Sequence, residues 1–150
     1  PKFAKDLVTG GGNKVEIEYP NGNASKFVAL YGFDELFDNL PDTITNFLFN
    51  NKSNDDFNLV LPKSISRFKN LEALLLMKCV SSIPEEVGEL QNLSFLALPD
   101  NPSLESIPAS VMNLPTLMFI NLKGSNPKLP EGFDERFNNE GTGFYTKKFK

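Results

Sequence analysis

The 150-residue sequence contains no histidine, no tryptophan and a single cysteine, Cys79. Without histidine, the chain cannot supply a Ser-His-Asp or Cys-His catalytic pair. With one cysteine, it cannot close an internal disulfide or provide the cysteine pairs of a zinc cage. We therefore expect a protein with no enzymatic activity, no metal and no cofactor, located in the cytoplasm or elsewhere inside the cell.

Long apolar runs and an excess of positive charge are also missing. No stretch approaches the run of about 18 apolar residues that a membrane span needs, and the first residues lack the apolar region of a secretory signal. Fifteen basic residues against nineteen acidic ones give a formal net charge of −4, whereas nucleic-acid-binding proteins normally carry a basic surface. We expect neither a membrane nor a nucleic acid as partner, and a chain of this length predicts one domain with its own core.

The chain does contain an internal repeat. A leucine or isoleucine precedes proline at steps of 22, 24 and 22 residues, at Leu61, Ile83, Ile107 and Leu129. Apolar residues follow this anchor at the fourth and seventh positions, which places them on one face of a short helical turn that the proline can start. An L-x-x-L-x-L pattern comes next, and its last two apolar residues are two apart, as in a half-buried strand. Each unit therefore predicts a helical turn followed by a strand.

Three of these units resemble the strand motif of the leucine-rich repeat family: LEALLLMKC (71–79), LSFLALPDN (93–101) and LMFINLKGS (117–125). Their I-P-x-x-V-x-x-L-x-N-L context is most similar to cytoplasmic plant and Ras-associated members. The resemblance implies an α/β solenoid with a small curved parallel sheet and short helical or 3₁₀ turns on the convex side. In this family the ninth motif position forms a ladder of bonds to neighbouring backbone groups. Here the ladder positions are Cys79, Asn101 and Ser125, and we expect weak bonding at both ends because only one is asparagine.

The two ends of the chain are expected to cap about four repeats in residues 33–133, because stacked repeats bury their faces only against neighbours. Residues 14–30 alternate on either side of Asn21-Gly22, a dipeptide that favours a type I′ turn, so we predict a β-hairpin cap within residues 1–32. Residues 134–150 lose the repeat and predict one last irregular strand. In the divergent first repeat, the ninth position falls on Lys52.

Strand residues between the core leucines alternate away from the core and should stand on the concave face of the sheet. Phe95 and Phe119 are in register beside Met77, and soluble monomers rarely expose a contiguous apolar patch of this kind unless something binds there. The resemblance implies recognition through this face, so we predict a non-catalytic module for protein–protein interaction. The predicted partner-binding residues are Leu48, Ala73, Leu75, Met77, Lys78, Phe95, Ala97, Pro99, Asp100, Phe119, Asn121 and Lys123.

Other interpretations of the patch stay open. The terminal segments or a second copy of the chain could cover it. The chain could instead be a structural subunit of a larger assembly, such as a phage or bacterial particle, with the patch permanently buried. It could also be the substrate-recognition domain of an enzyme such as a ubiquitin ligase, because LPDTITNF (40–47) resembles the LPxxL element of bacterial effector ligases.

Overall fold

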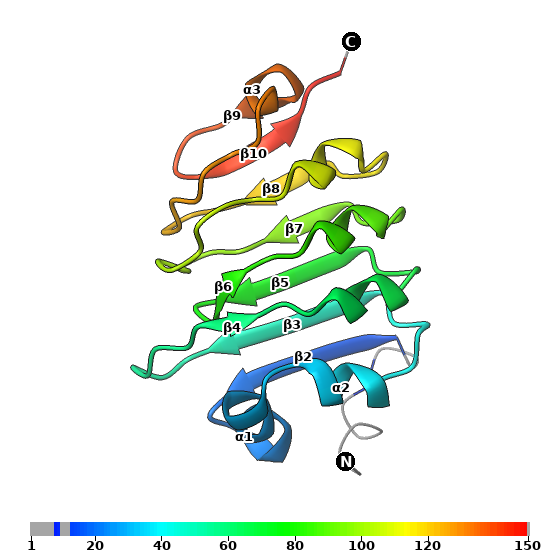
Figure 1. The fold of residues 1–150 in the computed structure, drawn as a ribbon, viewed down its shortest axis with the longest axis vertical. Coiled ribbons are helices and arrows are strands. Elements are labelled where there is room, and N and C mark those ends of the chain that lie inside the picture. The colour runs from blue at the N-terminus through cyan, green and yellow to red at the C-terminus, as the bar shows by residue number, and fades with distance from the viewer. Residues whose placement is uncertain (1–7, 10–12, 150) are drawn as a thin grey trace.

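The computed structural model describes residues 8–9 and 13–149 and has a mixed α/β architecture (Figure 1). Eight described strands form one sheet in the order β1-β2-β3-β5-β7-β8-β10-β9. Its five central strands run parallel: β2 (Lys14–Tyr19), β3 (Asn46–Asn51), β5 (Ala73–Met77), β7 (Phe95–Ala97) and β8 (Phe119–Asn121). The flanking strands are antiparallel: β1 (Val8–Thr9), β9 (Phe137–Asn139) and β10 (Phe144–Lys147). A separate pair, β4 (Leu59–Val60) and β6 (Val80–Ser82), is parallel.

Short helices connect the parallel strands. Three 3₁₀ helices each follow a proline at their N-cap: η2 (Lys63–Arg67), η3 (Glu85–Glu89) and η4 (Ala109–Asn113). The predicted turn after each of these Ile-Pro or Leu-Pro anchors is thereby confirmed. The α-helices are α1 (Gly22–Tyr31), α2 (Asp34–Asn39) and α3 (Phe133–Arg136). None of the helices in the described part of the chain is long and apolar enough to cross a membrane.

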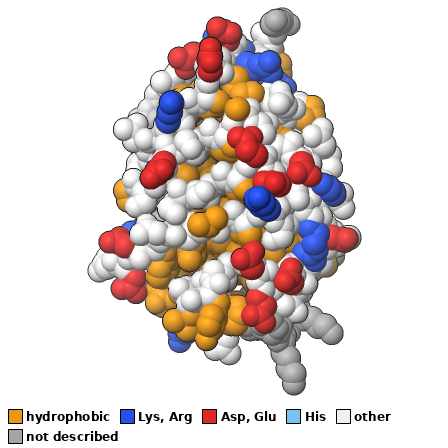
Figure 2. All heavy atoms as spheres, viewed as in Figure 1, with side chains coloured by type: hydrophobic (Ala, Val, Ile, Leu, Met, Phe, Trp, Pro, Cys, Tyr) orange, Lys and Arg blue, Asp and Glu red, His pale blue; other side chains and the backbone are white. Residues whose placement is uncertain are grey.

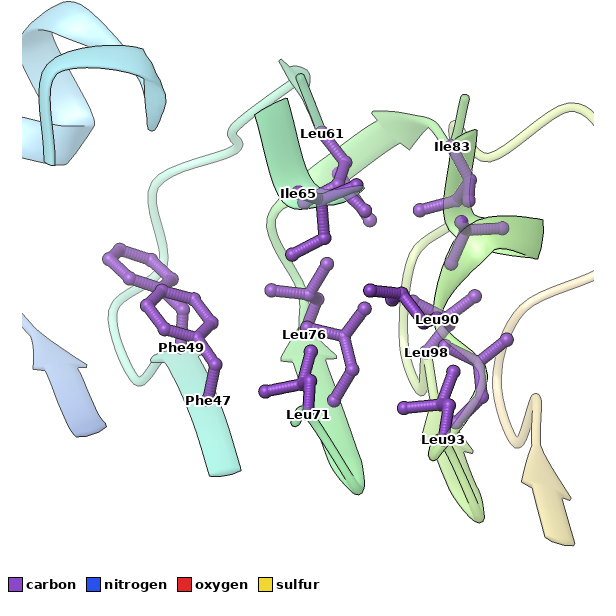
Figure 3. Packing of buried hydrophobic residues seen from close by; sticks show 14 of the residues in the cluster. Phe47, Phe49, Leu61, Ile65, Leu71, Leu76, Ile83, Leu90, Leu93 and Leu98 are labelled. Carbon is purple, nitrogen blue, oxygen red and sulfur yellow. The ribbon is translucent and has the colours of Figure 1, made fainter. Parts of the chain in front are cut away.

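One hydrophobic core lies between the sheet and the helices. Figure 3 shows Leu61 and Ile65 pointing toward Leu71 and Leu76 from the opposite side of the layer. The inward strand residues come from every second position and stand in register, with Phe47 beside Leu74 and Leu74 beside Leu96. Because side chains alternate along a strand, the residues between them face away from this core.

The predicted N-terminal hairpin around Asn21-Gly22 is wrong. β2 does form, but the chain continues into α1, which buries Ala24 and Val28 at helical spacing. β2 pairs with β3 in parallel on one edge and with β1 on the other. Since both edges of β2 are occupied, no edge remains for a strand returning from Asn21-Gly22. The sheet therefore has one more parallel strand than the repeat pattern predicts.

The C-terminal segment forms two strands, so the prediction of a single irregular strand is also wrong. β9 and β10 make an antiparallel hairpin, and β10 pairs with β8 at the end of the parallel strands. On the core side, the ring of Tyr145 lies 5.1 Å from that of Phe133, which stacks on Phe137 at 4.8 Å. These aromatic side chains close the end of the core that the last repeat leaves open.

Because Gly143 has no side chain, the C-terminal hairpin can pack closely against the backbone that follows β8. Replacement of Gly143 by alanine tests how close this packing is. Gly141 and Gly143 both have positive φ, 91° and 81°, so alanine at either site carries a left-handed penalty of about 1 kcal/mol. A Cβ at Gly143 would also lie 2.8 Å from Lys123 N and 2.9 Å from Leu122 C, whereas one at Gly141 would meet nothing within 4 Å. We expect Gly143→Ala to cost about 1–3 kcal/mol more than Gly141→Ala in chemical unfolding, with faster amide exchange in β10. Equal losses would contradict a close approach.

Candidate interaction surface

The side of the sheet opposite the core carries three rows of side chains, which we call the open sheet face. The first row is Lys14, Asn46, Ala73, Phe95, Phe119 and Thr146; the second is Glu16, Leu48, Leu75, Ala97, Asn121 and Phe144; the third is Glu18, Asn50 and Met77. The predicted in-register placement of Phe95 and Phe119 is confirmed, and Ala73 stands in the same row. Four other predicted contact residues, Leu48, Leu75, Ala97 and Asn121, share the second row.

Three phenylalanine rings follow one another across the open sheet face. Phe95 and Phe119 have ring centroids 6.4 Å apart, and Phe119 and Phe144 are 6.0 Å apart. Phe119 is 42% exposed and is the most accessible large apolar residue on this face. The sequence did not point to Phe144 because it lies beyond the repeat, although its alternation with Thr146 is a signal for a strand.

A shallow hollow lies next to this aromatic row. Its volume is about 210 Å³, and its lining includes Asn46, Leu48, Ala73, Leu75 and Phe95. The small side chain of Ala73 stands in register between Asn46 and Phe95, so the floor is lower there than on either side. The open sheet face therefore has both a projecting ring, on β8, and a largely apolar recess, over β3 and β5.

Two predicted contact residues are not accessible. Ala97 is 0% exposed although it lies outside the main core cluster, because its short side chain is overtopped by its neighbours in the row, Leu75 and Asn121. Pro99 is buried as well, and its carbonyl accepts a hydrogen bond from Lys78 N at 3.1 Å. The expectation that these two residues stand exposed on the sheet is wrong.

Lys78 and Asp100 lie beyond the carboxyl ends of the strands rather than on the open sheet face. Both have φ of 57°, and Gly124 has φ of 76° at the equivalent place in the next repeat. The ammonium of Lys78 donates to Ser53 O at 2.7 Å. These residues border a second hollow of about 600 Å³, which Asp56 and Asn101 also line. Lys123, by contrast, is exposed at the end of β8.

The three predicted ladder residues are joined by hydrogen bonds. Asn101 is 1% exposed, and its Oδ1 accepts from Cys79 N at 2.8 Å and from Val80 N at 3.0 Å. Its Nδ2 donates to Leu76 O at 2.9 Å and to Pro99 O at 3.2 Å. Ser125 Oγ donates to Leu98 O at 2.6 Å and accepts from Asn101 N at 2.8 Å. Asn101 is thus the residue that links three successive repeats.

The ladder extends to the first repeat through Asn51 rather than Lys52. Asn51 is buried, and its Nδ2 donates to Lys78 O at 3.1 Å and to Asp55 O at 2.7 Å. Lys52 instead points to solvent and forms an ion pair with Glu18 at 2.7 Å. The assignment of the ninth position to Lys52 is therefore wrong by one residue, because a lysine in the ladder would bury its charge without a partner.

Cys79 is buried at its place in the ladder. Burial raises the pKa of its thiol because the charged thiolate is poorly solvated there. A thiol held in its neutral form is a poor nucleophile, so we assign Cys79 a packing role in the core rather than a catalytic one.

Within residues 8–9 and 13–149, no group of three or more cysteine, aspartate or glutamate side chains could hold a metal ion. The aromatic row and the hollow beside it make the open sheet face the candidate site. No family model, curated protein or solved structure matches this chain.

Proposed function

We propose that the chain is a short leucine-rich repeat solenoid and acts as a non-catalytic module that binds a protein partner through its open sheet face. The repeated order of proline, 3₁₀ helix and parallel strand supports the solenoid assignment, as does the ladder centred on Asn101. Repeat units of this kind bury their core against neighbours and present an extended surface to partners.

The observation that carries the proposed binding role is the aromatic row of Phe95, Phe119 and Phe144 on the open sheet face. Phenylalanine and methionine are enriched in the cores of protein interfaces, and Met77 stands on the same face. A rigid sheet holds these side chains in place before binding, which lowers the entropic cost of association. The exposed Lys123 and Glu16 border the apolar residues and could provide specificity.

An intracellular location fits the same proposal. The chain has one cysteine, the buried Cys79, so it cannot close an internal disulfide. Structural disulfides form and persist in oxidising compartments and are rare in the cytosol.

The experiment that tests the proposed function compares two matched double variants in affinity capture with quantitative mass spectrometry. Phe95→Ala with Phe119→Ala removes two rings from the open sheet face, and we expect the loss of at least about 90% of a specific partner, because interface aromatics are typical hot spots. Leu30→Ala with Val60→Ala removes two residues that are 76% and 60% exposed elsewhere, and should retain the partner.

Circular dichroism should show that both double variants are folded, since all four side chains reach the surface. Capture of the same proteins at the same level by both would contradict binding through the open sheet face.

A further inference from the structure

The projecting ring and the recess of the open sheet face lie at mirrored distances from the middle of the sheet. In the strand order, the midline falls between β5 and β7, with four strands on each side. Phe119 projects from β8, the second strand on one side of the midline. The hollow lies over β3 and β5, the second and first strands on the other side.

A twofold axis parallel to the strands at this midline would join two copies face to face. Such an axis keeps the strand direction and reverses the strand order, so β8 of one copy lies over β3 of the other and β7 lies over β5. Rows are preserved, which brings Phe119 of one copy over Asn46 and the low floor at Ala73 of the other. The hollow is large enough to receive the ring of Phe119. A cavity of about 150 Å³ can hold a benzene ring, and the hollow measures about 210 Å³.

One pair of opposite charges on the open sheet face, Glu16 and Lys123, comes together under the same operation. Glu16 on β2 is exposed near one end of the sheet, and Lys123 is exposed beyond β8 near the other. The axis places β2 of one copy over β10 of the other, next to β8. Lys123 follows Asn121 by two residues and so stands one row beyond Glu16, and its long side chain can reach back across that row to the glutamate of the second copy. Neither side chain forms an ion pair with another residue of the described structure.

We propose that the occupant of the open sheet face is a second copy of this chain, in a twofold dimer that places Phe119 of each copy in the hollow of the other. This inference rests on the proposed function, because it names the partner of the same surface. Each interface contains two ring insertions and two Glu16–Lys123 contacts, as expected for an isologous contact.

The size of the face limits the strength of the dimer. From β2 to β10 there are five strand spacings, or about 24 Å, and three rows of side chains extend about 15 Å along the strands. That footprint is a few hundred Å² per copy, below the roughly 800 Å² per partner of stable complexes. We therefore expect a dissociation constant on the order of 10–100 µM and a reversible equilibrium.

Sedimentation equilibrium between about 1 µM and about 1 mM tests this inference, because that range brackets the expected constant. The wild type should pass from 16.7 kDa to twice that mass. Phe119→Ala should raise the dissociation constant at least about tenfold, as expected for a central aromatic residue. Leu30→Ala is the matched control, since Leu30 is 76% exposed on α1, and it should leave the equilibrium unchanged.

Charge variants test the twofold geometry itself. Glu16→Lys and Lys123→Glu each put like charges together in their own homodimer, so each alone should be weakened severalfold at low salt. A mixture of the two variants places lysine opposite glutamate at both contacts. The mixture should form a heterodimer, and added salt should weaken it. A mixture that stays monomeric while the wild type dimerises would overturn the arrangement.

The outcomes separate this inference from the proposed function. If the wild type is monomeric at every concentration but binds another protein in a Phe119-dependent way, the second copy is not the occupant and the proposed function stands. If it is monomeric and neither Phe119 nor Phe95 affects any binding, both proposals fail. A dimer disrupted by Leu30→Ala but not by Phe119→Ala would place the contact at α1, where Figure 2 also shows hydrophobic side chains, and would overturn the inference.

Discussion

Replacement of Asn101 by alanine is expected to lower the free energy of unfolding by about 3–5 kcal/mol, a large part of the 5–15 kcal/mol typical of a domain. The amide of Asn101 makes four hydrogen bonds and is 1% exposed. Alanine would leave the N–H groups of Cys79 and Val80 and the carbonyl of Leu76 without this partner. Each buried group left unsatisfied costs about 1–3 kcal/mol, less where water can reach it.

The matched control for Asn101→Ala is Asn92→Ala. Asn92 also bridges to the preceding repeat, by donating to Lys69 O at 2.8 Å, but it is exposed and makes this one side-chain bond. Water can replace that bond, so we expect a loss below about 1 kcal/mol. Urea unfolding of both variants gives the comparison. Similar losses for the two would mean that the ladder contributes little to the cohesion of the repeats.

Asn101 could be identified from sequence because the repeat period fixes its register. The same period correctly predicts which strand residues face the core and which face away. A shift of one residue would move every leucine of a strand to the opposite face, so the hydrophobic pattern leaves little freedom. In the divergent first repeat that constraint is weaker. Eleven residues separate Phe33 from Ile44, one more than the ten between Leu61 and Leu71, and with this extra residue the count places Lys52 at the ninth position. In the structure the buried, uncharged amide of Asn51 takes the ladder role instead.

The strand pairing at the ends of the sheet could not be predicted from the local sequence pattern, because it joins segments that are far apart in the chain. Residues 14–19 alternate as a strand should, and the structure forms β2 there. Its partner, however, is β3, which lies more than 25 residues later in the chain. Asn21-Gly22 is a strong local turn signal, but the turn it makes leads into α1 because the edges of β2 are filled by β1 and β3.

The composition of the open sheet face was also only partly predictable. Alternation indicates the direction of a side chain, but its exposure depends on the size of the neighbours in the row. Ala97 points away from the core as predicted and still has no accessible surface. Phe144 joins the aromatic row through the antiparallel pairing of β10 with β8, a contact that no repeat period indicates.

Replacement of Phe37 by alanine is expected to cost about 3–5 kcal/mol, the range for a buried phenylalanine truncated in a packed core. Phe37 lies in α2, is fully buried, and its ring centroid is 5.5 Å from that of Phe33 and 5.3 Å from those of Phe47 and Phe68. These rings come from the start of α2, from β3 and from the end of η2. Removing the central ring would therefore leave a cavity between the first repeat and the next.

The position of α2 gives the cavity little room to collapse. Arg67 donates hydrogen bonds from its guanidinium to the carbonyls of Phe37 and Leu40 at the end of α2, and its guanidinium carbon lies 4.7 Å from the ring centroid of Phe68. These bonds hold the helix end at a fixed place beside η2. A site that cannot relax loses the contacts of the removed ring outright, so the cost should fall in the upper part of the range.

Thermal and urea unfolding of a series of Phe37 variants measure how much stability is lost as the side chain is shortened. Phe37→Leu retains most of the buried volume and should cost less than half as much as Phe37→Ala, which should lower the melting temperature by about 10 °C or more. Phe149→Ala is the control, because Phe149 is 77% exposed and its loss should stay within about 0.5 kcal/mol. If Phe37→Ala costs no more than about 1 kcal/mol, the aromatic cluster is not tightly packed.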